Sequence, residues 1–190
     1  MNFPKTIPDK YYVLHGCPPS EAMLMPKEKR WMNWLADKLQ EKGLDATALD
    51  MPVSWNPKYV EWKKEFEKYP VTEKTVVVGH SCGGAFIVRW LLDTGRKIHK
   101  LILVAPARVP ETDDDSRKDL YDFELPREVP HLANEIVIFI SNDLPHMMKA
   151  FDLYNQALKP RVVRLENKQH FLFFQMNTNE FPELLEEVLR

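Results

Sequence analysis

The chain has 190 residues, a hydrophobic fraction of 44% and a charged fraction of 28%, which suit one soluble globular domain with a substantial core. The formal net charge of −2 argues against a dedicated nucleic-acid-binding protein, whose surface is normally basic. No apolar run reaches transmembrane length, residues 1–5 show no signal-like stretch, and two cysteines are too few for a secreted disulfide framework. We therefore expect a cytoplasmic protein with neither a membrane nor a nucleic-acid partner.

Apolar runs of strand length alternate with stretches of helical period, which is the pattern of βαβ units in a parallel sheet. The predicted strands are residues 11–14, 46–49, 75–78, 101–105, 136–140 and 162–165. Helices are predicted over residues 26–42, 57–68, 85–92, 145–158 and 179–189. Because crossovers between parallel strands are right-handed, helices should cover both faces of the sheet. The sequence thus predicts a single α/β domain over residues 1–190, with about six parallel strands.

The segment from Arg108 to Pro130 has no clear period. It is polar, acidic and rich in proline, as is typical of a long surface loop. We predict a mobile loop here, which either caps a functional site or forms plain surface.

Residues 79–83 read Gly-His-Ser-Cys-Gly and fit the G-x-S-x-G pattern of a nucleophile elbow, with Ser81 at its centre. The β-branched run of residues 75–78 precedes the pattern and the apolar residues 85–92 follow it, as strand and helix do in such an elbow. Glycines are needed because the serine backbone is strained and side chains beside it would collide with the strand and the helix. The alternative is a glycine-rich turn without chemistry.

A serine hydroxyl needs a base to take its proton and a carboxylate to orient that base. In α/β hydrolases the acid and then the histidine follow the serine, each in a loop after a strand. Asp143 follows the predicted strand 136–140 and His170 follows the predicted strand 162–165. Asp143 also suits a helix N-cap, and His170 could be a loop histidine half covered by phenylalanines. We predict a catalytic triad of Ser81, His170 and Asp143.

The oxyanion of an acyl-transfer intermediate needs backbone N–H donors. We expect one donor from Cys82, directly after the nucleophile, and one from Cys17 in the loop after the first strand. Because these loops should be neighbours, a Cys17–Cys82 redox pair is an alternative role for the two thiols. No residue spacing resembles a metal-ligand set, so neither a metal nor another cofactor is expected. The predicted substrate-pocket residues are His15, Gly16, Trp55, His146 and Phe171.

Several short motifs carry a resemblance to a known family: His15-Gly16, residues 31–35, 79–83 and 141–143, His170-Phe171 and residues 181–184. With these motifs, which span nearly the whole chain, it resembles the small α/β-hydrolase family typified by retinoblastoma-binding protein 9 (the serine hydrolase or DUF1234 group). The resemblance implies a lid-poor α/β-hydrolase fold with the Ser81–His170–Asp143 triad. Two residues depart from the family: Gln169 replaces the usual glycine before the histidine, and Cys82 stands where a small residue or leucine is common.

The motifs together predict a serine hydrolase that cleaves a small ester, thioester or amide through an acyl-enzyme on Ser81. Carboxylesterase, thioesterase and peptidase activities all remain open, and the aromatic residues near the pocket favour a hydrophobic acyl or aryl group. The alternative is a non-catalytic binding or scaffold protein that retains the fold, since function does not follow from fold alone. The sequence leaves the physiological substrate, the oligomeric state and any protein partner open.

Overall fold

Six parallel strands form the centre of the computed structural model, which describes residues 7–126, 129 and 131–190. The sheet has the order β2-β1-β3-β4-β5-β6, and every neighbouring pair is parallel. The α/β fold predicted from the sequence is therefore confirmed, while the N-terminal residues 1–5 lie outside the described residues. The strands are β1 (Lys10–Leu14), β2 (Ala46–Leu49), β3 (Thr75–His80), β4 (Ile98–Val104), β5 (Ala133–Ile140) and β6 (Arg161–Arg164).

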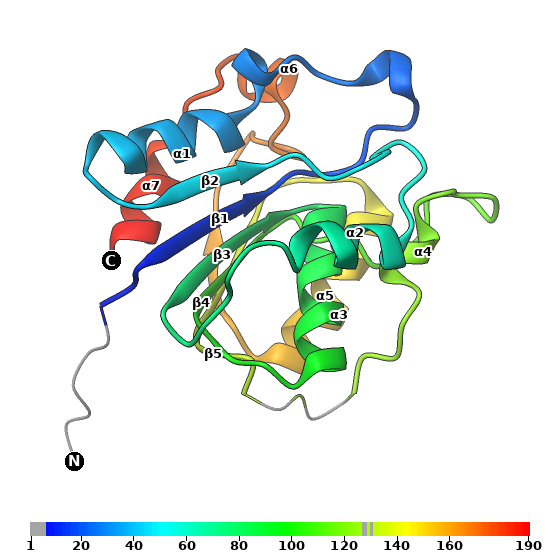
Figure 1. Cartoon of the computed structure of the whole chain (residues 1–190). Helices are drawn as coiled ribbons and strands as arrows, with labels where there is room; N and C mark the ends of the chain where they lie inside the picture. The colour runs from blue at the N-terminus through cyan, green and yellow to red at the C-terminus, as the bar shows by residue number, and fades with distance from the viewer. Residues whose placement is uncertain (1–6, 127–128, 130) are drawn as a thin grey trace.

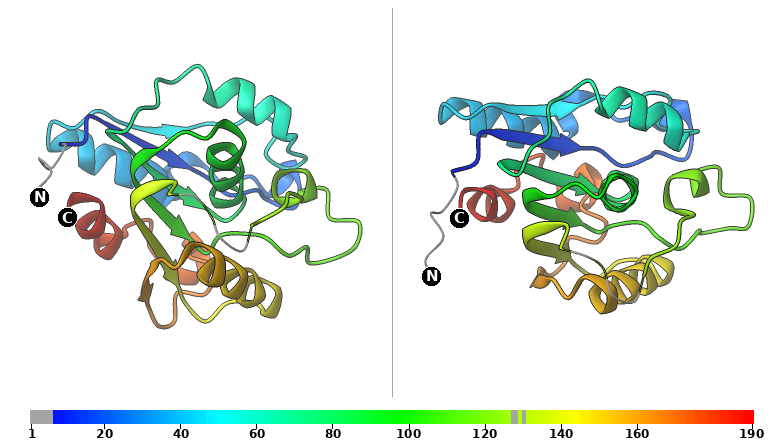
Figure 2. Two further views of the ribbon diagram at one scale, coloured as in Figure 1. Left: turned by 90° about the horizontal axis from the view of Figure 1, so that it is seen from below. Right: turned by 60° about the horizontal axis from the view of Figure 1, so that its bottom comes forward.

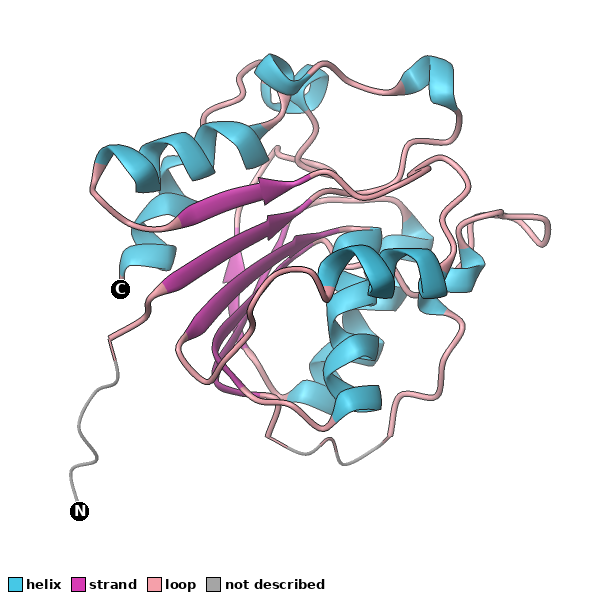
Figure 3. Cartoon of the chain, viewed as in Figure 1, coloured by secondary structure: helices cyan, strands magenta, loops and turns pink. Residues whose placement is uncertain are grey.

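Two layers of helices cover the sheet (Figures 1 and 2). Helices α1 (Trp31–Glu41) and α7 (Pro182–Leu189) pack on one face. Helices α2 (Tyr59–Phe66), α3 (Cys82–Thr94) and α5 (Pro145–Leu158) pack on the other, and Figure 3 shows the strands between the two layers. In the part of the chain that the structure describes, no helix has the length and apolar character needed to span a membrane.

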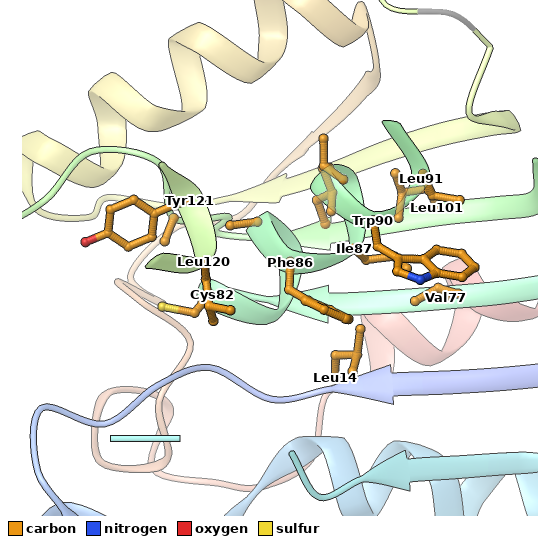
Figure 4. Packing of buried hydrophobic residues seen from close by; sticks show 14 of the residues in the cluster. Leu14, Val77, Cys82, Phe86, Ile87, Trp90, Leu91, Leu101, Leu120 and Tyr121 are labelled. Atoms are coloured by element: carbon orange, nitrogen blue, oxygen red, sulfur yellow. The ribbon is translucent and has the colours of Figure 1, made fainter. Parts of the chain in front are cut away.

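Strand β3 shows why both faces must be covered, because its side chains are buried on each side of the sheet. Val76 and Val78 belong to the core beneath α1 and α7, whereas Val77 belongs to the core beneath α3. On the α3 side, Phe86 and Trp90 pack over the sheet as Figure 4 shows. Edge-to-face contacts between aromatic rings stabilise this packing. Helix α3 is thus held firmly against the strand that precedes it.

The segment 108–130, predicted as a loop without regular structure, contains the short helix α4 (Lys118–Tyr121). Leu120 and Tyr121 are buried in the same core as α3, so this part of the segment is anchored. A helix of four residues is too short to show a hydrophobic period, which is why the sequence pattern missed it. The same reason applies to α6 (Phe173–Met176) and to the 3₁₀ turn η1 (Glu21–Met23). The 3₁₀ turn η2 (Lys27–Lys29) lies within the helix predicted over residues 26–42, in which the α-helix itself begins only at Trp31.

Candidate active site

The candidate site lies where the order of the strands changes direction. From β1 the chain passes to β2 on one side, whereas β3 lies on the other side of β1 and leads on to β4, β5 and β6. The helices that follow β1 and β3 pack on opposite faces of the sheet, so the loops at the carboxyl ends of these strands diverge and leave a crevice. A cavity of about 350 Å³ occupies this position, and Gly16, Ser81, Asp143 and His170 are among its lining residues.

Ser81 lies between β3 and α3 with φ 50° and ψ −119°, an unfavourable backbone conformation for a residue other than glycine. Its backbone is held by the hydrogen bond from Ser81 N to Val104 O, 3.0 Å long. The flanking glycines have no room for a side chain: a Cβ on Gly79 would lie 2.7 Å from Gly84 Cα, and one on Gly83 would lie 2.6 Å from His15 O. The strand, the tight turn and the helix predicted around Ser81 are all present.

His170 and Asp143 meet at the cavity wall, where His170 Nδ1 donates a hydrogen bond of 2.5 Å to Asp143 Oδ2. The other carboxylate oxygen of Asp143 accepts a hydrogen bond of 2.7 Å from the N–H of Leu144. Burial raises the pKa of Asp143, but the hydrogen bond and charge of His170 and the Leu144 N–H outweigh burial and leave this pKa below its ordinary value. Asp143 is therefore an ionised carboxylate that orients the His170 ring.

Residues 168–172, here called the histidine loop, have a strained backbone on both sides of His170. Gln169 and Phe171 adopt φ values of 47° and 59°, which lie in the left-handed region that favours glycine. Gln169 thus takes up the conformation that the glycine usual at this position in the family would adopt without strain. Because the strain must be balanced elsewhere, the surroundings of this loop determine where His170 points.

Three side chains outside the histidine loop hold it in place. His80 Nε2 donates to the carbonyl of His170 (2.9 Å), and Trp31 Nε1 donates to the carbonyl of Phe171 (3.0 Å). Gln175 Oε1 accepts from the N–H groups of His170 (2.9 Å) and Leu172 (3.1 Å). Burial lowers the pKa of His80 to about 3, so its ring stays neutral beside His170. The catalytic candidate is thereby fixed through its own backbone.

The loop after β1 also lines the cavity, through Gly16 and Cys17. His15 Nδ1 donates a hydrogen bond of 2.7 Å to the carbonyl of Gly16, and His15 Nε2 accepts one of 3.0 Å from the N–H of Met51. In a trans peptide the N–H points away from the carbonyl, so His15 fixes the direction of the Cys17 N–H. A Cβ on Gly16 would lie 2.9 Å from Ser81 Cβ, and this close approach requires glycine.

The sequence as a whole points to the same chemistry as this geometry, since the family model described as serine hydrolase matches residues 16–186. The chain belongs to this serine hydrolase family. The predicted membership of a small serine hydrolase family is thus confirmed.

Two relatives of this serine hydrolase are informative. Over 98 residues, 50% of this chain, it is 31% identical to the YdeN hydrolase of Bacillus subtilis (strain 168), and this match spans about half (48%) of the length of that relative. The crystal structure of the B. subtilis ydeN gene product has a TM-score of 0.78 at 19% identity, covering 95% of this chain and 97% of that chain. A structure from work on the metagenome-derived lipolytic enzymes LipS and LipT has a TM-score of 0.65 at 15% identity, and the match covers 97% of this chain and 94% of that chain. At these identities the two structures show a shared α/β-hydrolase fold.

The two cysteines of this serine hydrolase are free thiols that lie beside each other at the cavity. Burial, together with a hydrogen bond to Cys82, raises the pKa of Cys17 well above its ordinary value, so Cys17 remains protonated. Cys82 is the first residue of α3, where backbone N–H groups have no partner within the helix. Its side chain packs near Leu120 and Tyr121 in the core (Figure 4).

The structure places four of the five predicted pocket residues at the cavity: His15, Gly16, His146 and Phe171. Phe171 is fully buried and stacks on Phe181 at a centroid distance of 5.3 Å, so it supports the wall from below. Trp55 was predicted wrongly, because it is not among the residues that line the cavity. It lies in the turn after the edge strand β2, where its carbonyl accepts a hydrogen bond of 3.3 Å from Ser116.

Other lining residues were not predicted from the sequence. They include an ionic group from the segment 108–130, in which Asp115 accepts hydrogen bonds from Arg117 Nε (2.7 Å) and the Tyr121 hydroxyl (2.6 Å). Met23 and Leu24 also line the cavity. Neither group forms a periodic pattern or follows directly on a strand, so the sequence held no signal that joined them to Ser81.

Proposed function

We propose that this serine hydrolase cleaves carboxylic esters through an acyl-enzyme on Ser81. The observation that carries the proposal is the hydrogen bond between His170 Nδ1 and Asp143 Oδ2, made at the wall of the cavity that Ser81 also lines. Because Nδ1–H donates to the carboxylate, Nε2 is the basic nitrogen of the neutral ring. The lipolytic activity named for the LipS and LipT enzymes, which share the fold, supports an ester as the substrate.

In the proposed reaction, His170 Nε2 takes the proton of the Ser81 hydroxyl as Ser81 Oγ attacks the ester carbonyl. The negative charge moves to the carbonyl oxygen, where the backbone N–H groups of Cys82 and Cys17 stabilise it. When the tetrahedral intermediate collapses, His170 gives its proton to the departing alkoxide and the acyl group stays on Ser81. Water, activated by the same histidine, then releases the carboxylic acid. Thioesters and amides would react by the same steps with another leaving group.

Fluorophosphonate labelling and hydrolysis of p-nitrophenyl acetate test this proposal. We expect the wild type to label and to turn over ester, and Ser81→Ala to lose labelling and to lose about 10³-fold or more of kcat. Asp143→Asn should retain the fold but lower kcat by roughly 10²- to 10⁴-fold, because the ring loses its orienting charge. Ser20→Ala, at an exposed serine in the loop after β1, is the matched control and should label normally.

Two outcomes would overturn the proposal. Labelling that persists in Ser81→Ala would place the nucleophile elsewhere. A wild type that neither labels nor gives any Ser81-dependent rate with ester, thioester or amide substrates would favour the non-catalytic binding protein that the sequence left open as the alternative.

A further inference from the structure

Most polar side chains of the cavity wall are already bound to other groups of the protein. Asp115 is paired with Arg117 through two hydrogen bonds, of 2.7 and 2.9 Å, and also accepts the Tyr121 hydroxyl. The Gln175 side-chain oxygen is occupied by the histidine loop, and Arg30 Nε donates to the carbonyl of residue 25 at 2.6 Å.

The rest of the wall supplies apolar contact. Methionine contributes four of the lining side chains, and its flexible thioether adapts to the shape of an apolar ligand. The apolar residues that line the cavity include Met23, Leu24, Met25, Met32, Val109, Leu144, Met147, Leu172, Phe173 and Phe174.

Large apolar side chains also surround the mouth of the cavity, although they are exposed to solvent. We call Met23, Leu24, Leu144 and Phe174 the apolar rim; their exposed fractions are 62%, 42%, 55% and 65%. They come from three separate segments of the chain, which converge at this one place. Exposed apolar side chains gathered around a pocket mark a binding surface, and here that surface continues the wall above Ser81.

We propose that the cavity and the apolar rim bind the straight aliphatic chain of the substrate's acyl group, so that esters with chains longer than butanoyl are preferred. This inference rests on the proposed function, because Ser81 must hold the acyl carbon. From there the chain follows the apolar wall and emerges over the rim, while the polar side chains keep their present partners. Each methylene that moves from water onto the wall favours binding.

A series of p-nitrophenyl esters, from acetate through butanoate and hexanoate to octanoate, tests the inference with one leaving group. Below the concentration at which the esters aggregate, kcat/KM should rise by up to about fourfold per added methylene, the factor expected when a methylene is fully buried. A matched series of acetate esters with lengthening alcohols should give nearly constant kcat/KM. If the alcohol series rises and the acyl series does not, the rim binds the alcohol and the inference is wrong.

Substitutions in the apolar rim test whether these side chains cause the preference for longer acyl chains. Phe174→Ser and Met23→Ser change exposed side chains, so folding should not depend on them, and each should lower the octanoate-to-acetate ratio of kcat/KM by roughly tenfold or less. Val60→Ser, at an equally exposed apolar residue on α2, is the matched control and should keep the wild-type ratio.

The failure of this inference can be told apart from the failure of the proposed function. If the octanoate-to-acetate ratio of kcat/KM is near one in the wild type while Ser81-dependent acetate hydrolysis is intact, the cavity does not select an aliphatic acyl chain. The proposed ester hydrolase activity would then still stand. A wild type without Ser81-dependent hydrolysis of any ester would overturn both.

Discussion

Two buried histidines at the site, His15 and His80, bind backbone carbonyls of the loops that surround Ser81. His15 holds the peptide whose N–H belongs to Cys17, and His80 holds the carbonyl of His170. Burial lowers the pKa of both rings, so each remains neutral and adds no positive charge beside His170. Neutral donors suit this task because a fixed cation here would oppose the imidazolium that forms during proton transfer.

The contact between His80 and the histidine loop predicts a contrast between two substitutions at one position. His80→Gln retains a side-chain N–H near the place of Nε2, whereas the shorter His80→Asn cannot reach the His170 carbonyl. We expect His80→Asn to lower kcat by roughly 10- to 100-fold with little change in KM, because a small displacement of the base is costly, and His80→Gln to retain more of the rate. Steady-state kinetics with a p-nitrophenyl ester measure both values.

Equal losses in His80→Asn and His80→Gln would argue against this reading. The role of His80 would then be packing against the Trp31 ring, with which it makes an edge-to-face contact at a centroid distance of 5.5 Å.

The sequence pointed to the residue types of the site but could not identify the partners of these buried histidines. Ser81, Asp143 and His170 stand out because each lies in the segment that follows a strand, and strand ends of a parallel sheet converge. The bond between His80 and His170 joins residues 90 positions apart, and no local pattern marks it. Trp55 was misplaced for the same reason, since an aromatic residue in a loop carries no indication of the direction it faces.

At the scale of secondary structure elements, the predicted and observed bounds of helices and strands agree best where apolar runs end at helix or strand breakers. Strand β2 (Ala46–Leu49) and helix α5 (Pro145–Leu158) have the predicted bounds. Strands β4 and β5 each begin three residues earlier than predicted, because polar residues interrupt the apolar run there. Lys100 and Glu135 lie opposite each other in the ladder and form an ion pair of 3.1 Å, so their charges are matched within the sheet.

Helix α3, which carries the nucleophile turn at its start, ends at Gly95 in a left-handed conformation with φ 64°. A Cβ at this position would meet no atom within 4 Å, so a substitution tests backbone strain alone. We expect Gly95→Ala to lower the free energy of unfolding by about 1 kcal/mol and Tm by roughly 2–4 °C, with kcat unchanged. Thermal and urea unfolding measure the loss.

Gly95→Asn is the matched comparison for this helix end. Asparagine tolerates the left-handed region better than alanine, so it should lose less stability than Gly95→Ala. If both variants are as stable as the wild type, the left-handed end is not a determinant of the stability of α3.

At the scale of the whole molecule, an ionic cluster ties the C-terminal helix to the sheet. The Lys100 ammonium on β4 is buried, and it contacts Glu187 Oε1 on α7 at 2.6 Å as well as Glu135 on β5. Arg161 on β6 pairs with the same two glutamates. The cluster therefore joins three strands to the C-terminal helix α7, and it limits how far the end of the chain can move relative to His170.

This cluster predicts a specific dependence of stability on pH. Burial raises the pKa of Glu187, but its bonds to Arg161 and Lys100 outweigh burial and hold this pKa below its ordinary value of 4.5. The unfolded chain then binds a proton more readily than the folded one, so the contribution of Glu187 is complete above about pH 4.5 and is lost as the pH falls below it. Glu187→Gln should cost about 2 kcal/mol at pH 7 and less at pH 3.5, because below pH 4.5 the unfolded wild-type chain gains a proton at Glu187 and its contribution to stability falls. Urea unfolding at both pH values gives the comparison.

Glu186→Gln, on the exposed side of α7, is the control and should be as stable as the wild type at both pH values. If Glu187→Gln loses as much stability at pH 3.5 as at pH 7, the glutamate acts by packing and not by charge.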